Sequence, residues 1–137
     1  MVYFFAFIGM LCWGVSPIFA KLGLKDINPL VGLSVRTFFT ATAILIWLLL
    51  SGGITELKDI SSKALFLLVL EAILATLIGD LAYFAALKQG SPAIVMLIMA
   101  CSPVVTILTA VLFLGEKLTL SHLIGACLAM IGIILIV

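Results

Sequence analysis

The strongest constraint on the fold is the apolar stretch Ala64–Leu87, ALFLLVLEAILATLIGDLAYFAAL, which contains two carboxylates. At about 1.5 Å per residue, a helix of this length covers about 36 Å. That is more than the ~30 Å hydrocarbon core of a bilayer. A carboxylate near the centre of a membrane helix costs about 2.5–3.5 kcal/mol. Glu71 and Asp80 must therefore face protein or water, and such groups by default mark a functional site.

The composition extends this conclusion to the whole chain. Hydrophobic residues make up 66% of the sequence, charged residues only 9%, and the mean hydropathy is +1.49. Soluble domains are about 45–50% apolar. We therefore predict an integral membrane protein. The net charge of +1 gives no basic surface for nucleic acid.

Polar segments divide the chain into long apolar runs. Asn28 and Pro29 predict a helix start, Ser51–Gly53 a helix end, and the segment 88–92 a stop followed by a new start. We predict an all-α integral membrane protein with one domain, 1–137, and five transmembrane helices at about 2–20, 29–50, 64–87, 92–114 and 119–137.

The third predicted helix carries its polar residues on two faces. Thr76, Asp80 and Tyr83 follow the i, i+4, i+7 spacing of one face. Glu71 precedes Asp80 by nine residues, or about 900° of rotation in a regular helix, so it points to the opposite face. The two carboxylates are therefore not expected to share a pocket within one copy of the chain.

Arg36 is the expected partner of Asp80. Each lies about eight residues from a helix end on the same membrane side, so both are roughly 12 Å deep. Pairing would remove much of the insertion cost of both groups. The pair is either a static clamp between two helices or a functional pair that opens to admit substrate or a proton.

Other polar and aromatic residues are weaker candidates for a substrate site. Ser102 and Thr106 share a helix face, although such hydroxyls also bond their own backbone. Trp13, Tyr83 and Phe84 would wall an apolar pocket or serve only in packing. A seam of small residues in the last helix suits helix packing or dimer contact and comprises Gly125, Ala129 and Gly132.

The sequence does not favour an enzyme. It contains no nucleophile–base arrangement, no metal-ligand spacing and no phosphate-binding loop, so we expect no cofactor and no metal. The three cysteines lie in apolar runs outside any metal or redox spacing, which is typical of packing residues.

The charges give no firm orientation in the membrane. In a five-helix arrangement, three lysines fall near each membrane side: Lys58, Lys63 and Lys117 on one, and Lys21, Lys25 and Lys88 on the other. Under the positive-inside rule this is a tie. The alternatives are one fixed orientation set during insertion and copies inserted both ways.

Several motifs together resemble a known family, the EamA-type half of the drug/metabolite transporter superfamily. The similarity covers essentially the whole chain, which resembles the short five-helix bacterial and archaeal branch. The residues that carry it are Trp13–Gly14, Arg36, Tyr83–Lys88, Ser91–Ala93, Ser102–Val104, Leu114–Leu118 and Ile124–Gly125.

This resemblance implies a fold and a function. Most similar proteins carry two five-helix halves as an inverted repeat (5+5), with substrate near the membrane midplane. It implies a plasma-membrane transporter of small metabolites or amphipathic organic compounds, working as an alternating-access exporter and an antiparallel homodimer. Independently of the resemblance, Glu71, removed from water without a nearby cation, is a candidate for proton coupling. The alternatives are an accessory subunit of a lipid-carrier flippase or hetero-oligomeric transporter, and one half of a larger transporter.

Overall fold

The computed structural model describes residues 1–115, 117 and 119–135, which form helices and connecting turns without a strand. The prediction of an all-helical protein is confirmed for these residues. The chain divides into two compact units. We call Ile18–Gln89 the central unit, and Met1–Pro17 with Gly90–Val137 the terminal unit, and describe each by itself.

Four helical stretches in the described part of the chain are long and apolar enough to cross a membrane. They are Val2–Gly23, Pro29–Leu50, Ser62–Gln89 and Pro92–Leu114. The fifth predicted helix corresponds to α7, Leu120–Ile134, which has 15 described helical residues. A membrane crossing needs about 20 residues, and residues 136 and 137 lie outside the described part. The fifth crossing therefore stays a prediction.

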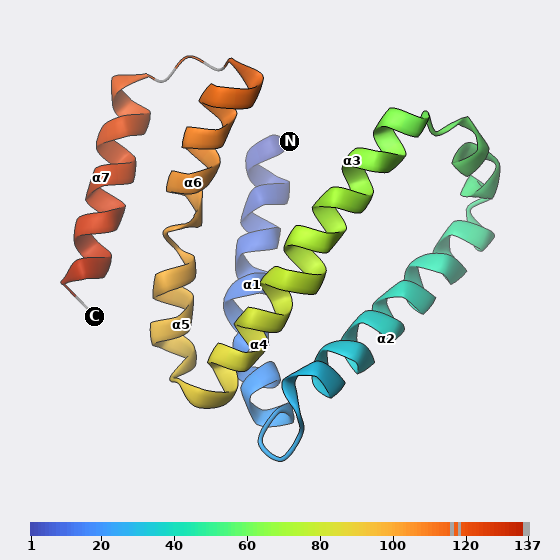
Figure 1. Ribbon diagram of the computed structural model, residues 1–137, viewed down its shortest axis with the longest axis horizontal. Coiled ribbons are helices and arrows are strands. Elements are labelled where there is room, and N and C mark those ends of the chain that lie inside the picture. Colours follow the sequence, from blue (N-terminus) through green and yellow to red (C-terminus); the bar gives the residue numbers. More distant parts are fainter. Residues whose placement is uncertain (116, 118, 136–137) are drawn as a thin grey trace. The chain divides into compact units, whose positions relative to one another are not determined.

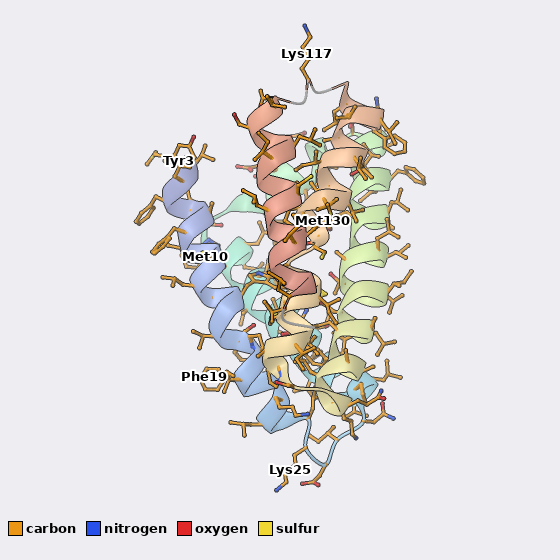
Figure 2. The ribbon with its side chains drawn as sticks, turned by 90° about the vertical axis from the view of Figure 1, so that its left-hand side faces the viewer. Tyr3, Met10, Phe19, Lys25, Lys117 and Met130 are labelled. Carbon is orange, nitrogen blue, oxygen red and sulfur yellow. The ribbon has the colours of Figure 1, made fainter. Side chains whose placement is uncertain are left out.

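The first helix, α1 (Val2–Gly23), presents apolar side chains outward along its length. Tyr3, Met10 and Phe19 project from it in Figure 2 and are 89%, 57% and 70% exposed. A soluble helix would not leave side chains of this size in water, whereas hydrocarbon solvates them. The exposure fits a helix that faces lipid or further protein.

The second helix, α2 (Pro29–Leu50), begins as the sequence predicts. The Asn28 side chain accepts a hydrogen bond of 2.9 Å from the Leu30 backbone N–H, and Pro29 occupies the first turn. The cap satisfies one of the N–H groups that a helix start leaves open, and proline has no N–H to satisfy. The polar connection after α2 contains a short 3-10 helix, η1 (Gly53–Asp59).

The third span is built from three segments: α3 (Ser62–Ala72), the π-helical η2 (Ile73–Gly79) and α4 (Asp80–Gln89). The sequence analysis treated this span as one regular helix. In a π segment each hydrogen bond reaches back five residues instead of four, so the rotation between residues before and after it differs from that of an α-helix. The estimate of 900° between Glu71 and Asp80 therefore does not apply.

The core of the central unit lies where α2 packs on α4 (Figure 1). Its buried apolar side chains are Leu24, Leu33, Tyr83, Phe84 and Leu87. Gly32 leaves room for the Leu24 side chain, because a Cβ there would lie 2.5 Å from Leu24 Cδ2. From the contact of α2 with α4, α2 and α3 diverge toward η1 (Figure 1).

Two lysines fix the end of α4 in this core. Lys21 Nζ donates to the backbone oxygens of Leu87 (2.6 Å) and Lys88 (3.0 Å). Lys88 Nζ donates to the Ile27 oxygen at 2.7 Å, in the turn that precedes α2. The bonds of Lys21 satisfy carbonyls that the C-terminus of α4 leaves open, and both cations suit the negative end of the helix dipole. The last turn of α4 is thereby held to its neighbours in the central unit.

The terminal unit contains the proline-broken fourth span. α5 (Pro92–Met99) ends before Cys101, and α6 (Ser102–Thr109) restarts with Pro103 in its first turn. Proline lacks the N–H that would continue the helix, which accounts for the interruption between α5 and α6. A π segment, η3 (Ala110–Leu114), follows and ends at Gly115, whose φ of +65° is in the left-handed region that favours glycine.

Gly79 closes the π segment directly before Asp80, and its substitution tests that segment. A Cβ on Gly79 would lie 3.0 Å from the backbone oxygen of Leu74, which a helix cannot move cheaply. We expect Gly79→Ala to lower the free energy of unfolding in detergent by an amount typical of overpacking, about 1–3 kcal/mol. The midpoint of thermal unfolding should fall accordingly. Gly9→Ala in α1 is the matched control, since its Cβ meets no atom within 4 Å. Equal or greater stability of Gly79→Ala relative to the control would contradict the π geometry.

Candidate functional site

An ion pair joins α2 to α4 in the central unit. Arg36 Nη2 donates a hydrogen bond to Asp80 Oδ2, and the two groups form a salt bridge. The pairing predicted from their equal depth is confirmed. Asp80 is the first residue after the π segment, so η2 sets the direction in which its carboxylate leaves the helix.

The ring of Phe84 supports the guanidinium of Arg36. The guanidinium carbon lies 5.1 Å from the centroid of this ring, which is a cation–π distance. Phe84 is one turn after Asp80, so a single face of α4 supplies both the carboxylate and the ring. Tyr83 packs beside Phe84 with ring centroids 5.8 Å apart. Both aromatic side chains are buried, which places predicted site residue Tyr83 in the core next to the pair.

The two partners of the ion pair differ in exposure. The Arg36 side chain is 40% exposed and that of Asp80 only 11%. An isolated carboxylate so shielded would be costly, and the arginine offsets this cost. The arginine itself keeps an open side, so it is the accessible group of the pair.

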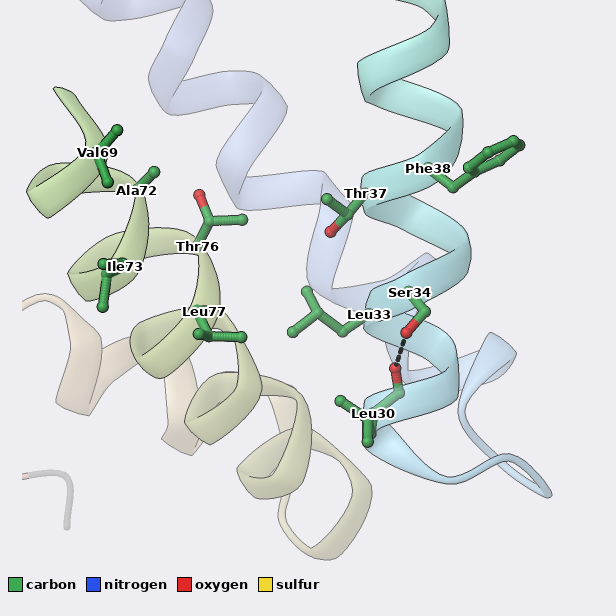
Figure 3. A pocket seen from close by; sticks show the side chains of 10 residues that line it. All are labelled: Leu30, Leu33, Ser34, Thr37, Phe38, Val69, Ala72, Ile73, Thr76 and Leu77. Atoms are coloured by element: carbon green, nitrogen blue, oxygen red, sulfur yellow. Dashed lines mark hydrogen bonds between the residues drawn. The ribbon is translucent and has the colours of Figure 1, made fainter. Parts of the chain in front are cut away.

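A groove of about 600 Å³ opens between α2 and the α3–η2 segment (Figure 3). Leu33 and Thr37 in its wall lie within one helical turn of Arg36, and Thr76 and Leu77 lie within one turn of Asp80. Neither Arg36 nor Asp80 is itself part of the lining. The lining is apolar except for three hydroxyls and comprises Leu30, Leu33, Ser34, Thr37, Phe38, Val69, Ala72, Ile73, Thr76 and Leu77.

Two of the hydroxyls in the groove have unused hydrogen-bonding capacity. Ser34 Oγ donates to the Leu30 oxygen at 2.8 Å, as drawn in Figure 3. Thr37 and Thr76 extend from opposite walls (Figure 3), and within the described residues neither hydroxyl has a hydrogen-bond partner. The other threonines of the described spans bond a carbonyl one turn back, namely Thr40, Thr42, Thr106 and Thr109. Thr76 was predicted as a site residue, and Thr37 was not.

Glu71 lies away from the ion pair. It is exposed on α3, and no hydrogen bond or ion pair to its carboxylate is present among the described residues. The expectation that the two carboxylates of the third span do not share a pocket within one copy stays a prediction, and the helical rotation on which it rested does not hold across the π segment.

The remaining predicted site residues belong to the terminal unit. Trp13 is exposed on α1, at 54%. Ser102 begins α6, and Thr106 Oγ1 donates to the Ser102 backbone oxygen at 3.2 Å, so this hydroxyl bonds its own helix. Their role in a substrate site stays a prediction.

The predicted small-residue seam lies on α7. A Cβ at Gly125 or Gly132 would meet no atom within 4 Å, so both positions have open space beside them. The side chain of Ala129 lies outside the described residues. A role for this seam in helix packing or dimer contact stays a prediction.

Phe84 was predicted only as a wall of an apolar pocket, and Thr37 is a residue of this site that the sequence analysis missed. Phe84 follows Asp80 by four residues, a spacing that places two side chains on one helix face. Thr37 follows Arg36 directly, and no spacing to another polar residue sets it apart in the sequence. The spacing to Asp80 was a usable signal for Phe84, whereas Thr37 has none in the sequence.

The ion pair and the groove lie in helices that are long and apolar enough to cross a membrane. The chain belongs to the EamA-like transporter family, whose model matches residues 1–137. The resemblance noted in the sequence is therefore confirmed.

Relatives come from both archaea and bacteria. The chain is 31% identical over 126 residues to a protein of Archaeoglobus fulgidus named an uncharacterized transporter, covering 92% of this chain and 44% of that protein. It is 32% identical over 133 residues to an uncharacterized transporter of Sinorhizobium sp., covering 97% and 94%. An uncharacterized protein of Methanocaldococcus jannaschii is 35% identical over 127 residues, covering 90% and 87%. No solved structure matches the chain.

Removing the charge of Asp80 tests whether the pair stabilises the central unit. Asp80→Asn leaves the guanidinium without its charged partner, and a hydrogen bond to a charged group contributes about 1.5–3 kcal/mol. We expect a loss of about this size in the free energy of unfolding in detergent. Asp59→Asn is the matched control, because Asp59 is exposed in η1 outside the span. Equal stability of the two variants would contradict a structural contribution of the pair.

Proposed function

We propose that this protein is an alternating-access exporter of small metabolites or amphipathic organic compounds in the plasma membrane. The observation that carries the proposal is the Arg36–Asp80 ion pair within helices that are long and apolar enough to cross a membrane. Charged groups in a span are costly and are kept where they serve a pathway for substrate or ions. Family membership supports transport as the general activity.

The proposal includes an antiparallel homodimer. The chain spans 44% of the Archaeoglobus relative but 94% of the Sinorhizobium relative, so related proteins exist at about one and about two lengths of this chain. Two copies would supply the equivalent of the longer relatives. With five crossings, a second half joined in tandem is automatically inverted, and two separate copies reproduce that arrangement only by facing opposite ways. The lysine tie between the two sides is compatible with both orientations.

In this dimer Glu71 is the proton-binding group. It lies about as far before the middle of the third span as Asp80 lies after it, so a reversed copy brings Glu71 to the depth of the ion pair. Its exposure and lack of a partner in the described residues leave it available to a shared cavity. A carboxylate in a poorly hydrated site without a cation takes up a proton more readily. Proton uptake by Glu71 would then accompany substrate exchange.

The terminal unit would complete the transport pathway. Trp13, Ser102 and Thr106 are the residues proposed to line the cavity from this part of the chain. The seam of Gly125, Ala129 and Gly132 would let a second helix approach closely at the dimer contact. The whole chain, 1–137, would act as one transmembrane domain in each copy.

Two single-cysteine additions test the antiparallel arrangement. Lys25→Cys, in the turn after α1, and Lys58→Cys, in η1, lie on opposite membrane sides in a single orientation. We expect each to be labelled at about half yield in intact cells by a membrane-impermeant thiol reagent, relative to permeabilised cells. The parent protein, with its three cysteines in the spans, measures background labelling. Full labelling at one position and none at the other would contradict the antiparallel dimer.

Reconstitution into vesicles tests transport itself. We expect the purified chain alone to accumulate members of a panel of organic acids, amino acids and amphipathic cations when a pH gradient is imposed. Glu71→Gln should make that transport insensitive to the gradient, because the amide binds no proton. Glu56→Gln in η1 is the matched control and should retain the pH response.

Two outcomes would contradict parts of this proposal. If Glu71→Gln kept the full pH response, Glu71 would not be the coupling group. If the purified chain transported nothing until a second protein was added, the accessory-subunit function would replace independent transport.

A further inference from the structure

We propose that the groove between α2 and the α3–η2 segment binds an uncharged amphipathic compound, whose polar group bonds Thr37 and Thr76 and whose apolar body packs on the side chains around them. The inference goes beyond the proposed transport, because a compound can bind in this groove without being carried across the membrane. The Arg36–Asp80 pair takes no part in it, since neither residue lines the groove. Three features of the groove carry the proposal.

The first feature is a lining without charge. The described residues that line the groove include no ionisable side chain, and Glu71 is not among them although its neighbour Ala72 is. Thr76 lies at the middle of the third span, Ser62–Gln89, where an unpaired charge is most costly. An anion or a cation would find no counter-charge in this lining, so the groove favours an uncharged ligand.

The second feature is the size and composition of the groove. Its volume of about 600 Å³ is within the ~300–1,000 Å³ usual for small-molecule pockets. Apolar side chains extend from both walls, among them Leu33 and Phe38 on α2 and Ile73 and Leu77 on η2 (Figure 3). Lipid tails are as apolar as these side chains, so apolar contact alone does not favour a ligand over lipid. The polar groups of the groove therefore decide what binds.

The third feature is a pair of hydroxyls on opposite walls. Thr37 on α2 and Thr76 on η2 extend from these walls (Figure 3), and neither has a hydrogen-bond partner among the described residues. Thr40, on the same helix as Thr37, instead donates to the Arg36 carbonyl at 2.9 Å. A threonine hydroxyl can both donate and accept a hydrogen bond. An amide or hydroxyl group of a ligand placed between the walls can therefore bond both threonines.

Two other occupants satisfy these features less well. A lipid acyl chain would fill part of the volume but offer no hydrogen-bond partner to Thr37 or Thr76, and a polar group without a partner away from water costs free energy. An apolar helix of a second copy would have the same shortcoming and would exclude small molecules from the groove. The experiments below separate both cases from an uncharged amphipathic ligand.

Binding to the purified full chain in detergent tests the proposal with four probes that share one aromatic body. Naphthaleneacetamide is uncharged and polar, ethylnaphthalene is apolar, naphthaleneacetate is an anion and naphthylethylamine is a cation. Equilibrium dialysis with the same micelles on both sides of the membrane cancels the partition of each probe into detergent. We expect naphthaleneacetamide to bind roughly tenfold or more tightly than each of the others, because only this probe gains two hydrogen bonds without an unpaired charge.

Three outcomes of the dialysis would overturn the proposal. Equal binding of ethylnaphthalene and naphthaleneacetamide would identify a site for acyl chains, in which the hydroxyls do not matter. Tighter binding of naphthaleneacetate or naphthylethylamine would show that the ligand meets a charge. Absence of binding by all four probes would show a groove that is closed to small molecules, as a helix of a second copy would close it.

Removal of each hydroxyl links the preference to the two threonines. Thr37→Val and Thr76→Val keep the side-chain shape and delete one hydrogen-bonding group each. We expect each variant to weaken naphthaleneacetamide binding about fivefold, the value of one hydrogen bond, and to leave ethylnaphthalene binding unchanged. Thr40→Val is the matched control, since the Thr40 hydroxyl bonds its own helix, and it should change neither. Unchanged naphthaleneacetamide binding in both groove variants would overturn the assignment.

A filled groove tests the location of the ligand. Ala72→Trp places a large side chain in the lining, whereas Ala75→Trp, on the same span outside the lining, is the matched control. We expect a folded, monodisperse Ala72→Trp protein to lose naphthaleneacetamide binding and the control to keep it. Retention of binding in Ala72→Trp would place the probe elsewhere and overturn the proposal. Because the readout is binding at equilibrium, it is independent of whether the chain transports any compound across vesicles.

Discussion

The ion pair between Arg36 and Asp80 is the interaction on which the central unit depends. Each group alone would oppose membrane insertion by about 2.5–3.5 kcal/mol, and their pairing offsets part of that cost. The pair joins α2 to α4, while Lys21 binds the last carbonyls of α4 and Lys88 binds Ile27 in the turn before α2.

The π segment η2 links the ion pair to the groove along the third span. It ends at Gly79, directly before the carboxylate, and its wall residues Ile73, Thr76 and Leu77 line the groove. Such segments are frequent at functional sites because they redirect side chains without ending the helix. Here the segment precedes the shielded Asp80 carboxylate, which pairs with the more exposed Arg36.

The sequence predicted the parts of this arrangement that depend on spacing and chain chemistry. Asn28 and Pro29 define the start of α2, and equal depth the pairing of Arg36 with Asp80. The π segment could not be predicted, because ILATLIG is as apolar and helix-compatible as its neighbours. The exposure of each partner also escaped prediction, since it depends on how α2 and α3 diverge. Family resemblance predicted transport but no ligand, because the matching motifs lie largely outside the groove.

Reversal of the two charges tests most directly whether the Arg36–Asp80 pair stabilises the central unit. Arg36→Asp and Asp80→Arg each place like charges together within the span, and we expect each to lower the free energy of unfolding in detergent. The double variant restores opposite charges with their positions exchanged, so the account predicts recovery of most of the stability lost in the single variants. A double variant whose loss equals the sum of the two single losses would show that the groups do not interact and would contradict the account.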